Sequence, residues 1–161
     1  MPDVEVILAP ARRQDVPVIL ALIQGLAEYE RLSHEVVATT DKLEASLFGP
    51  GPAAEVVLAW AGGEAVGFAL FFHNYSTFLA RRGLYLEDLF VVPEWRGRGV
   101  GRRLLTHLAK IAVERGCGRF EWSVLSWNEP AVGFYQKLGA DVMEDWRICR
   151  VTGDALVRLA K

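Results

Sequence analysis

The stretch that most constrains the fold is VVPEWRGRGVGR, residues 91–102. It starts in an apolar run that we predict to be a strand from Leu84 to Val92, closed by Pro93. It ends at a predicted helix from Gly101 to Arg115, in which apolar residues recur on one face at helical spacing. A glycine-rich turn between a strand and the start of a helix is a common way to bind phosphate.

The physical reason lies in the first turn of the helix, where backbone N–H groups have no partner and the helix dipole favours an anion. Gly97, Gly99 and Gly101 lack side chains, so a phosphate can approach these donors closely. The spacing does not fit GxxxxGK[ST] or GxGxxG, which excludes the two common nucleotide-binding motifs. A solvated turn and an RNA-binding Arg-Gly segment are the alternatives, but the flanking strand and helix favour a phosphate grip.

The rest of the chain shows the same mixture of strands and helices. Before the glycine-rich turn we predict a strand over Val4–Ala9, helices over Gln14–Glu30 and Asp41–Phe48, and a hairpin of Ala54–Ala61 and Ala65–Tyr75 around Gly62-Gly63. Thr40 is the predicted N-cap of the second helix. After the helix that follows the turn we predict a strand over Arg119–Val124, a helix over Pro130–Leu138, and two short strands before and after Trp146. This order favours one mixed α/β domain over residues 1–161.

Composition narrows the class of protein. The net charge is −2, so nothing suggests a nucleic-acid or membrane surface, and no apolar run is long enough to cross a bilayer. Cys117 and Cys149 show no metal-ligand or disulfide pattern and are expected to be reduced and buried. With no signal-peptide pattern, we expect a cytoplasmic protein. The three histidines also lack metal-ligand spacing, so no metal is expected.

Several motifs resemble one known family. The run Arg-x-x-Gly-x-Gly at Arg96–Gly101 resembles the acetyl-CoA motif of the GNAT acetyltransferase superfamily. The segments LYLEDLFV (residues 84–91), WNEP (127–130) and LAEYE (26–30) resemble the spermidine/spermine (diamine) and thialysine N-acetyltransferase branch. The resemblance covers nearly the whole chain. It implies a twisted mixed sheet splayed at the acetyl-CoA strand and flanked by helices, direct acetyl transfer to a primary amine, and a homodimer.

Glu87 is the candidate general base. An alkyl amine arrives protonated, since its pKa is about 10, and must lose a proton to attack a thioester. Glu87 lies beside Asp88 in an otherwise apolar strand, where a carboxylate costs free energy unless it has a partner or a role. A strand-edge carboxylate paired with an arginine is the structural alternative. The resemblance implies a substrate contact and base.

Tyr135 is the candidate general acid for the leaving thiolate. Ala131, Phe134, Tyr135 and Leu138 share one face of the predicted helix, so Tyr135 points inward. Core packing with a satisfied hydroxyl is the ordinary explanation of such a tyrosine. The family places its thiol-protonating tyrosine at this step, seven residues after the asparagine that corresponds to Asn128.

The resemblance also implies two sets of binding residues. The predicted cofactor contacts are Leu89, Phe90, Val91, Arg96, Gly97, Arg98, Gly99, Val100, Gly101, Arg102, Asn128, Glu129, Pro130 and Ala131. The predicted substrate contacts are Tyr29, Glu30, Glu87, Glu121, Trp122, Ser123 and Glu144. Glu121 and Ser123 differ in type from the residues that the resemblance leads us to expect, which leaves the amine open.

Alternative functions follow from the same residues. The acceptor could be a thialysine-like or lysine-like amino acid instead of a polyamine. A noncatalytic CoA-binding module is a second alternative, against which the presence of both Glu87 and Tyr135 argues. A cysteine nucleophile lacks a nearby histidine signature in the sequence.

Overall fold

The structure is a computed structural model that describes residues 3–161. The chain divides into two compact units, the first ending at Ser123 and the second comprising Val124–Lys161. The two units are therefore described separately.

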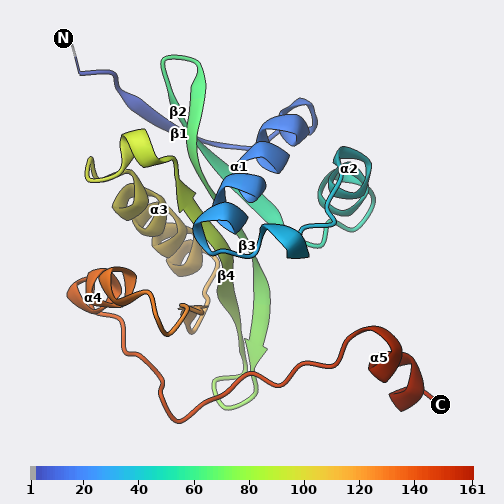
Figure 1. The fold of residues 1–161 in the computed structure, drawn as a ribbon. Coiled ribbons are helices and arrows are strands. Elements are labelled where there is room, and N and C mark those ends of the chain that lie inside the picture. The colour runs from blue at the N-terminus through green and yellow to red at the C-terminus, as the bar shows by residue number, and fades with distance from the viewer. Residues whose placement is uncertain (1–2) are drawn as a thin grey trace. The chain divides into compact units, whose positions relative to one another are not determined.

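The first unit is built on a five-stranded sheet in the order β1-β2-β3-β4-β5 (Figure 1). The strands are β1 (Val6–Pro10), β2 (Glu55–Ala61), β3 (Glu64–Ser76), β4 (Arg81–Val91) and β5 (Phe120–Trp122). Strands β1 to β4 pair antiparallel, whereas β5 pairs parallel with β4. This confirms the mixed sheet, although β4 starts earlier and β5 is shorter than predicted.

The predicted β2–β3 hairpin is present. Its turn residues Gly62 and Gly63 have φ angles of 58° and 83°, both in the left-handed region that a two-residue hairpin turn requires. The next hairpin, β3–β4, is the longest pairing in the sheet, and its second strand carries Glu87 and Asp88. The sequence pattern therefore predicts the central strands well.

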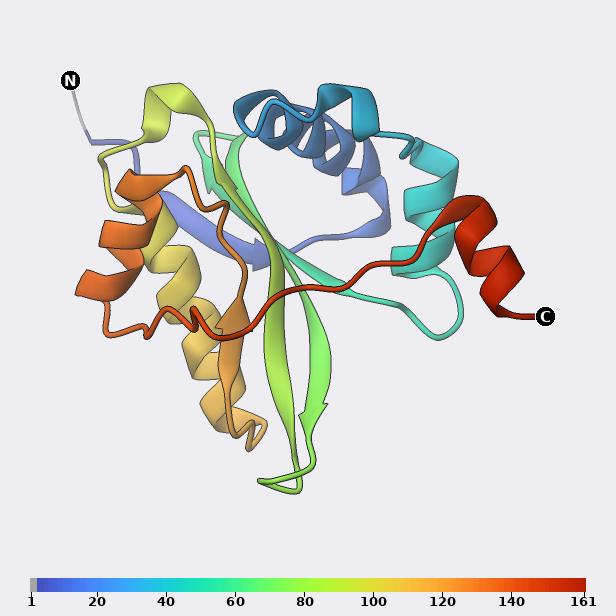
Figure 2. The same cartoon turned by 60° about the horizontal axis from the view of Figure 1, so that its bottom comes forward.

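Helices cover both faces of this sheet (Figure 2). On one face, α1 (Val16–Tyr29) and α2 (Thr40–Phe48) build a core in which Ile19 and Leu22 pack with Phe68 and Phe90. On the other face lies α3 (Val100–Glu114), whose Leu104 approaches Gly67 of β3. Short 3-10 turns, η1 (Arg13–Asp15), η2 (Ser33–Glu35) and η3 (Pro93–Trp95), connect these elements.

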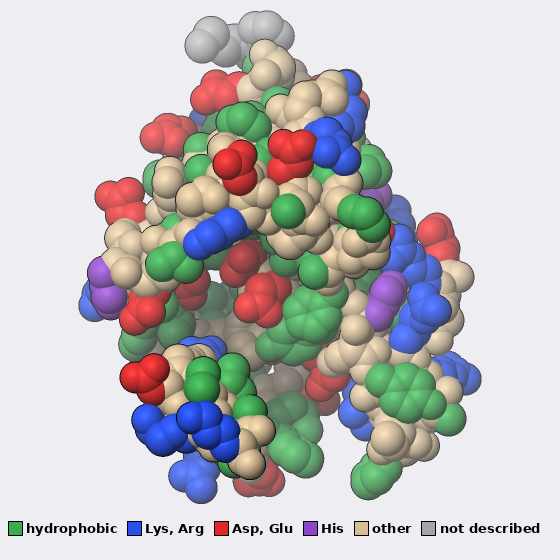
Figure 3. Space-filling view, turned by 90° about the vertical axis from the view of Figure 1, so that its right-hand side faces the viewer, with side chains coloured by type: hydrophobic (Ala, Val, Ile, Leu, Met, Phe, Trp, Pro, Cys, Tyr) green, Lys and Arg blue, Asp and Glu red, His purple; other side chains and the backbone are tan. Residues whose placement is uncertain are grey.

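The second unit contains α4 (Glu129–Lys137) and α5 (Gly153–Leu159). The two strands predicted around Trp146 are wrong, because residues 140–152 are irregular and the described chain forms no strand after Trp122. A strand needs a paired neighbour, and alternating apolar residues cannot supply one by themselves. Instead, Trp146 and Ile148 are 77% and 73% exposed. Hydrophobic side chains are visible among charged ones on the face shown in Figure 3.

Two local predictions need correction. Thr39, not Thr40, is the N-cap of α2, because its extended backbone lets the hydroxyl accept a hydrogen bond from the N–H of Lys42 at 3.2 Å. Cys149 is exposed instead of buried, since it lies in the irregular segment of the second unit, and Cys117 is half-buried.

Candidate active site

Strand β4 is interrupted at Glu87. Across the β3–β4 pairing, Leu70 lies opposite Asp88 and Phe71 lies opposite Leu86, so Glu87 is an extra residue without a partner on β3. Such a bulge bends a strand and redirects its side chains. No side chain in β4 marks the bulge in the sequence, and the structure has it at the candidate base Glu87.

The sheet also opens at the same place. Strand β5 pairs with β4 only from Leu84 to Leu86, opposite Phe120 to Trp122. From Asp88 to Val91, β4 keeps its β3 partner but has none on the β5 side within the described residues. The predicted splay is confirmed. The predicted cofactor contacts Leu89, Phe90 and Val91 lie on the part of β4 beyond the β5 pairing.

Three carboxyl groups surround the bulge. Asp88 is half-buried, and burial raises its pKa to about 6, with further raising by the charges of Glu87 and Glu30. Burial also raises the pKa of Glu30, which caps the end of α1. Glu87 itself is exposed, and no ion pair involves it among residues 3–161. The alternative of a Glu87–arginine pair is therefore not what the structure shows.

The glycine-rich loop leads directly from β4 to α3. Gly97 and Gly99 have φ angles of 75° and 81°, so both adopt the left-handed conformation that glycine accepts without strain. Helix α3 begins at Val100, one residue earlier than predicted, and no side chain caps its N-terminus. No protein atom lies within 4 Å of the position that a Cβ would take at Gly97 or Gly99. The first turn thus presents free N–H donors to open space, which fits a phosphate.

The loop arginines have different contacts. The Arg96 Nε donates a hydrogen bond of 3.0 Å to the Val91 carbonyl, and its guanidinium lies 4.6 Å from the centre of the Tyr29 ring. The Arg98 guanidinium stacks over Trp95, 4.7 Å from the ring centre. Arg102 lines a shallow groove between β1 and α3. Arg96 therefore fastens the loop to β4 and α1, while Arg98 and Arg102 both line the groove beside β1.

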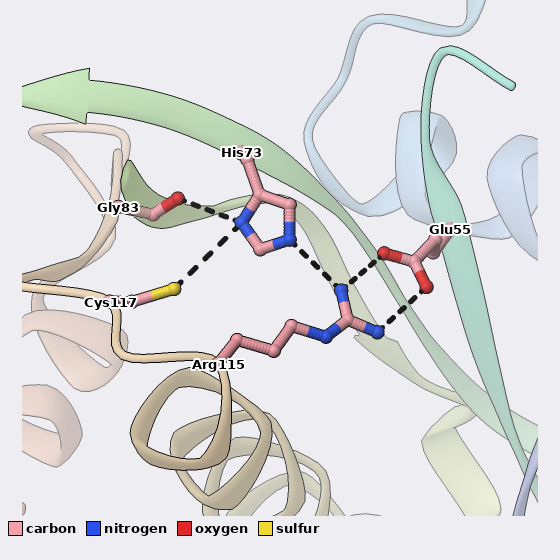
Figure 4. Close-up of polar contacts among 5 residues, drawn as sticks. All are labelled: Glu55, His73, Gly83, Arg115 and Cys117. Atoms are coloured by element: carbon pink, nitrogen blue, oxygen red, sulfur yellow. Dashed lines mark hydrogen bonds and ion pairs between the residues drawn. The ribbon is translucent and has the colours of Figure 1, made fainter. Parts of the chain in front are cut away.

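A polar network holds the other end of α3 (Figure 4). Arg115 donates two hydrogen bonds to Glu55 of β2, at 2.7 and 3.0 Å, and a third contact of 2.9 Å to the Nε2 of His73. The Nδ1 of His73 lies 3.0 Å from the carbonyl oxygen of Gly83 and 3.8 Å from the Sγ of Cys117. The hydrogen bond from Arg115 lowers the pKa of Glu55. These contacts fix the C-terminal end of α3 to three strands of the sheet, and they therefore limit the movement of the helix as a whole, including its N-terminus.

The second unit holds Asn128, Glu129, Pro130, Ala131, Tyr135 and Glu144. Asn128 is the N-cap of α4, and its Oδ1 accepts from the N–H of Ala131 at 3.4 Å, as expected for a capping residue. Tyr135 is half-buried, and its ring lies 5.6 Å from that of Phe134. Glu144 is exposed in the irregular segment after α4. Tyr135 and its aromatic neighbour Phe134 are thus both half-buried in α4.

The remaining predicted substrate residues lie in two places in the first unit, at the C-terminal end of α1 and at β5. Tyr29 and Glu30 end α1, and Glu121, Trp122 and Ser123 lie in or just after β5. The Ser123 hydroxyl is 2.8 Å from the Tyr85 hydroxyl, and the Asn74 amide donates to Glu121 across 3.5 Å. Sequence reasoning missed Tyr85 and Asn74, although Tyr85 lies in the same quoted strand, two residues before Glu87.

Metal and membrane features are not found in the described chain. Within residues 3–161, no group of three or more His, Cys, Asp or Glu side chains could hold a metal ion. None of the described helices is long and apolar enough to cross a membrane.

Comparison with known proteins agrees with this geometry. Residues 21–140 match the Acetyltransferase (GNAT) family. The chain belongs to the GNAT family of acetyltransferases. The predicted enzyme class, an acetyl-CoA-dependent N-acetyltransferase, and the predicted fold are therefore confirmed.

Similar proteins carry specific names. A thialysine N-epsilon-acetyltransferase of Mus musculus is 38% identical, with 93% of this chain and 94% of the relative covered. The L-ornithine N5-acetyltransferase NATA1 of Arabidopsis thaliana is 36% identical, with 91% of this chain and 84% of the relative covered. Among solved structures, an integron cassette protein from the mobile metagenome of V. cholerae superposes with a TM-score of 0.81 at 27% identity, covering 97% of this chain and 98% of that one.

Proposed function

We propose that this acetyltransferase transfers the acetyl group of acetyl-CoA directly to a primary amine of a small cationic substrate, such as a diamine or polyamine. The observation that carries the proposal is the carboxyl pair Glu87 and Asp88 at the bulge where β5 leaves β4. An opening in a sheet that is lined by carboxylates attracts a cation and gives its nitrogen a proton acceptor.

The β4–α3 segment supplies the cofactor grip. The free N–H donors of the first turn of α3 bind the pyrophosphate, with Gly97 and Gly99 keeping the approach open. Arg98 and Arg102 add positive charge near the phosphates. The backbone of Leu89–Val91, which β5 does not pair, is available to the pantetheine arm and to the acetyl carbonyl oxygen.

Proton transfers complete the chemistry. The amine nitrogen attacks the acetyl carbon, the carbon–sulfur bond breaks, and the nitrogen gives up a proton. Burial raises the pKa of Asp88 to about 6, which makes it a competent base. We therefore propose that Asp88 takes that proton in place of Glu87, the base that the resemblance implies, while Glu87 faces the amine. For the departing thiolate, Tyr135 is the proposed proton donor on the basis of the sequence resemblance.

A second acceptor class has specific support. The similar proteins named above are called thialysine and ornithine acetyltransferases, and both of those substrates carry a primary amine at the end of a side chain. An amino acid with a terminal amine is therefore the alternative substrate for the same site and the same chemistry.

A substrate screen tests the proposal. Acetyl-CoA consumption is measured with diamines, polyamines, ornithine and lysine analogues, aminoglycosides and peptides. We expect turnover with amines that are cationic and small. Acetylation of a peptide N-terminus alone, or of no amine, would overturn the proposal while leaving the family assignment intact.

We also propose a homodimer. Leu156, Val157 and Leu159 of α5 are 52%, 58% and 73% exposed, although hydrophobic side chains in a short helix are normally covered. A second copy of the chain would cover them. Light scattering at micromolar concentration is expected to give twice the monomer mass, and a monomer at every concentration would contradict this.

A further inference from the structure

The shallow groove between β1 and α3 is a basic cavity that the proposed reaction does not use. Its volume is about 670 Å³, within the range of small-molecule sites in proteins. The basic side chains in its lining are Arg98, Arg102, Arg103, His107 and Lys110. Among the described residues of that lining, Glu5 is the only carboxylate. Because the whole chain has a net charge of −2, this concentration of positive charge is a local feature of the groove.

Four of the lining side chains share one face of α3. Arg103, Thr106, His107 and Lys110 stand at i, i+3, i+4 and i+7, which is the spacing of neighbours on a helix surface. A rise of 1.5 Å per residue puts roughly 10 Å between the first and the last of them. Together they form a line of three basic groups and one hydroxyl along the groove, which we call the basic row.

The basic row has no counter-charge from its own chain. Within residues 3–161, no ion pair includes Arg103, His107 or Lys110. The first turn of α3 contains no acidic residue, although the helix dipole favours negative charge there, and Arg103 brings a positive charge to that end instead. An anion from solution would supply the negative charge that this part of the fold lacks.

Arg103 gives the row a fixed end. Its Nη1 donates a hydrogen bond of 2.6 Å to the carbonyl oxygen of Val6, which ties α3 to β1. A carbonyl oxygen carries no net charge, so the guanidinium stays cationic, and its other N–H groups can bind a ligand. A solvated helix face is the ordinary explanation of a basic row. Arg103 argues against it here, because its guanidinium is held at the wall of a cavity.

Most of the basic row is separate from the proposed path of acetyl-CoA. That path follows β4 where β5 leaves it unpaired, whereas the groove is bounded by β1 at the opposite end of the sheet order. The two share only the loop residues Arg98, Gly99 and Arg102. Lys110 lies ten residues after the start of α3, which is roughly 15 Å from the first-turn donors.

We propose that the groove between β1 and α3 is a second anion site, which binds a linear phosphate chain separately from acetyl-CoA. Phosphate oxygens suit the donors present, because guanidinium, ammonium, imidazole and hydroxyl groups all donate hydrogen bonds to them. After a hydrogen bond of about 2.8 Å at each end, the basic row leaves space for two or three linked phosphate groups. Because the two sites share loop residues, a phosphate chain in the groove weakens acetyl-CoA binding by charge repulsion.

The experiment titrates inorganic triphosphate into the full chain by calorimetry, at low ionic strength and without an amine. The titration is repeated at rising concentrations of acetyl-CoA. For two coupled sites, the triphosphate affinity falls by a few-fold and then stays constant once acetyl-CoA is saturating. If triphosphate binds only where the pyrophosphate binds, its apparent affinity keeps falling in proportion to the acetyl-CoA concentration. That result, or no binding of triphosphate, overturns the proposal.

Two substitutions of opposite sign test the groove, both measured with saturating acetyl-CoA. Lys110→Gln removes a cation from the basic row and should weaken triphosphate binding by about fivefold, the scale of one exposed charge contact. Glu5→Gln removes the carboxylate of the lining and should strengthen binding by up to the same factor, and it keeps the test open if Lys110→Gln does not fold. Lys161→Gln alters an exposed lysine at the end of the chain and should leave the affinity unchanged.

Two further readings separate a second site from an extension of the first. Neither Lys110 nor Glu5 is a predicted cofactor contact, so both variants should bind acetyl-CoA as the wild type does when triphosphate is absent. An equal loss of affinity for both ligands in Lys110→Gln would assign the groove to the cofactor. Triphosphate affinity that neither substitution changes would make the basic row a solvated helix face. Each of these results overturns the second site and leaves the proposed acetylation of an amine standing, because the experiment uses no amine.

Discussion

Helices α3 and α4 both begin at residues for which we predict cofactor contacts. They differ in whether a side chain of the protein accepts a hydrogen bond from the backbone N–H donors of the first turn. Helix α4 has an internal cap, since the Asn128 side chain accepts from the N–H of Ala131. The N-cap of helix α3 is Gly99, which has no side chain to offer, and the first N–H donors of α3 face open space. A glycine N-cap costs only a few tenths of a kcal/mol against a capping side chain, and it leaves the first turn of α3 open to the anion that we propose binds there.

The two regions also differ in how their chemistry can be recognised. Around α3, the candidate groups stand out as departures from regular structure, namely a bulge, two left-handed glycines and an aspartate with a raised pKa. In the second unit, Tyr135 sits in an ordinary helix beside Phe134. Its proposed role rests on its position in the sequence, so kinetic experiments are the way to test it.

The largest effect is expected for Tyr135→Phe. The variant loses one hydroxyl and keeps the ring that packs beside Phe134, so stability and acetyl-CoA affinity should change little. The loss of a general acid should lower kcat by about 10²–10⁴-fold. Tyr75→Phe is the matched control, because Tyr75 is 66% exposed and should keep wild-type kcat. Equal kcat in the two variants would reduce Tyr135 to a packing residue.

The next largest effect, on acetyl-CoA affinity, is expected at the uncapped N-terminus of α3. Gly99→Asp places a carboxylate where we expect the pyrophosphate. Two like charges about 4 Å apart repel by several kcal/mol near a protein surface, so acetyl-CoA affinity measured by calorimetry should fall by about 100-fold or more. Gly99→Asn has the same shape and a similar tolerance of positive φ, but no charge. It should lose far less affinity, and equal losses would assign the effect to backbone strain instead of charge.

How far the sequence predicts this molecule depends on whether a feature is local. The helix over residues 100–114 and the Gly62-Gly63 hairpin follow from periodicity and turn chemistry, which depend on near neighbours. The bulge at Glu87 depends on how β3 and β4 align, and no residue in β4 marks it. The strands expected around Trp146 failed for the same reason, because a strand requires a partner that a local pattern cannot supply. The Tyr85–Ser123 and Asn74–Glu121 contacts likewise join residues far apart in sequence.

Smaller effects, of opposite sign on stability and on activity, are expected for a substitution of Asp88. In the folded protein the pKa of Asp88 is about 6, above the ordinary aspartate value of 3.8. The protonated carboxyl therefore favours the folded state fully only below pH 3.8, and this contribution is lost as the pH rises through 6. Asp88→Asn removes this cost, so urea unfolding at pH 8 should show a gain of about 3 kcal/mol that disappears near pH 4. Acetylation of the amine should fall in the same variant, because the proton acceptor is gone.

A gain in stability together with a loss of activity would show that the buried carboxyl group of Asp88 destabilises the fold but is needed for the reaction. Asp145→Asn alters an exposed residue of the second unit and should change neither quantity. If Asp88→Asn is no more stable than the wild type at pH 8, the carboxyl is well solvated, and its proposed role as a proton acceptor with a raised pKa is wrong.

The smallest effect is expected at the capped N-terminus of α4. It separates the two roles predicted for Asn128, as the helix N-cap and as a cofactor contact. Removing the cap with Asn128→Ala should lower the free energy of unfolding by about 1 kcal/mol, since the N–H of Ala131 loses its acceptor. Asn128→Asp keeps an acceptor of the same shape and should restore that stability. If Asn128 also contacts the cofactor, the new negative charge should weaken acetyl-CoA binding even though the helix is capped. If affinity instead follows stability across both variants, Asn128 acts only as a cap, and the phosphate grip belongs to the α3 end alone.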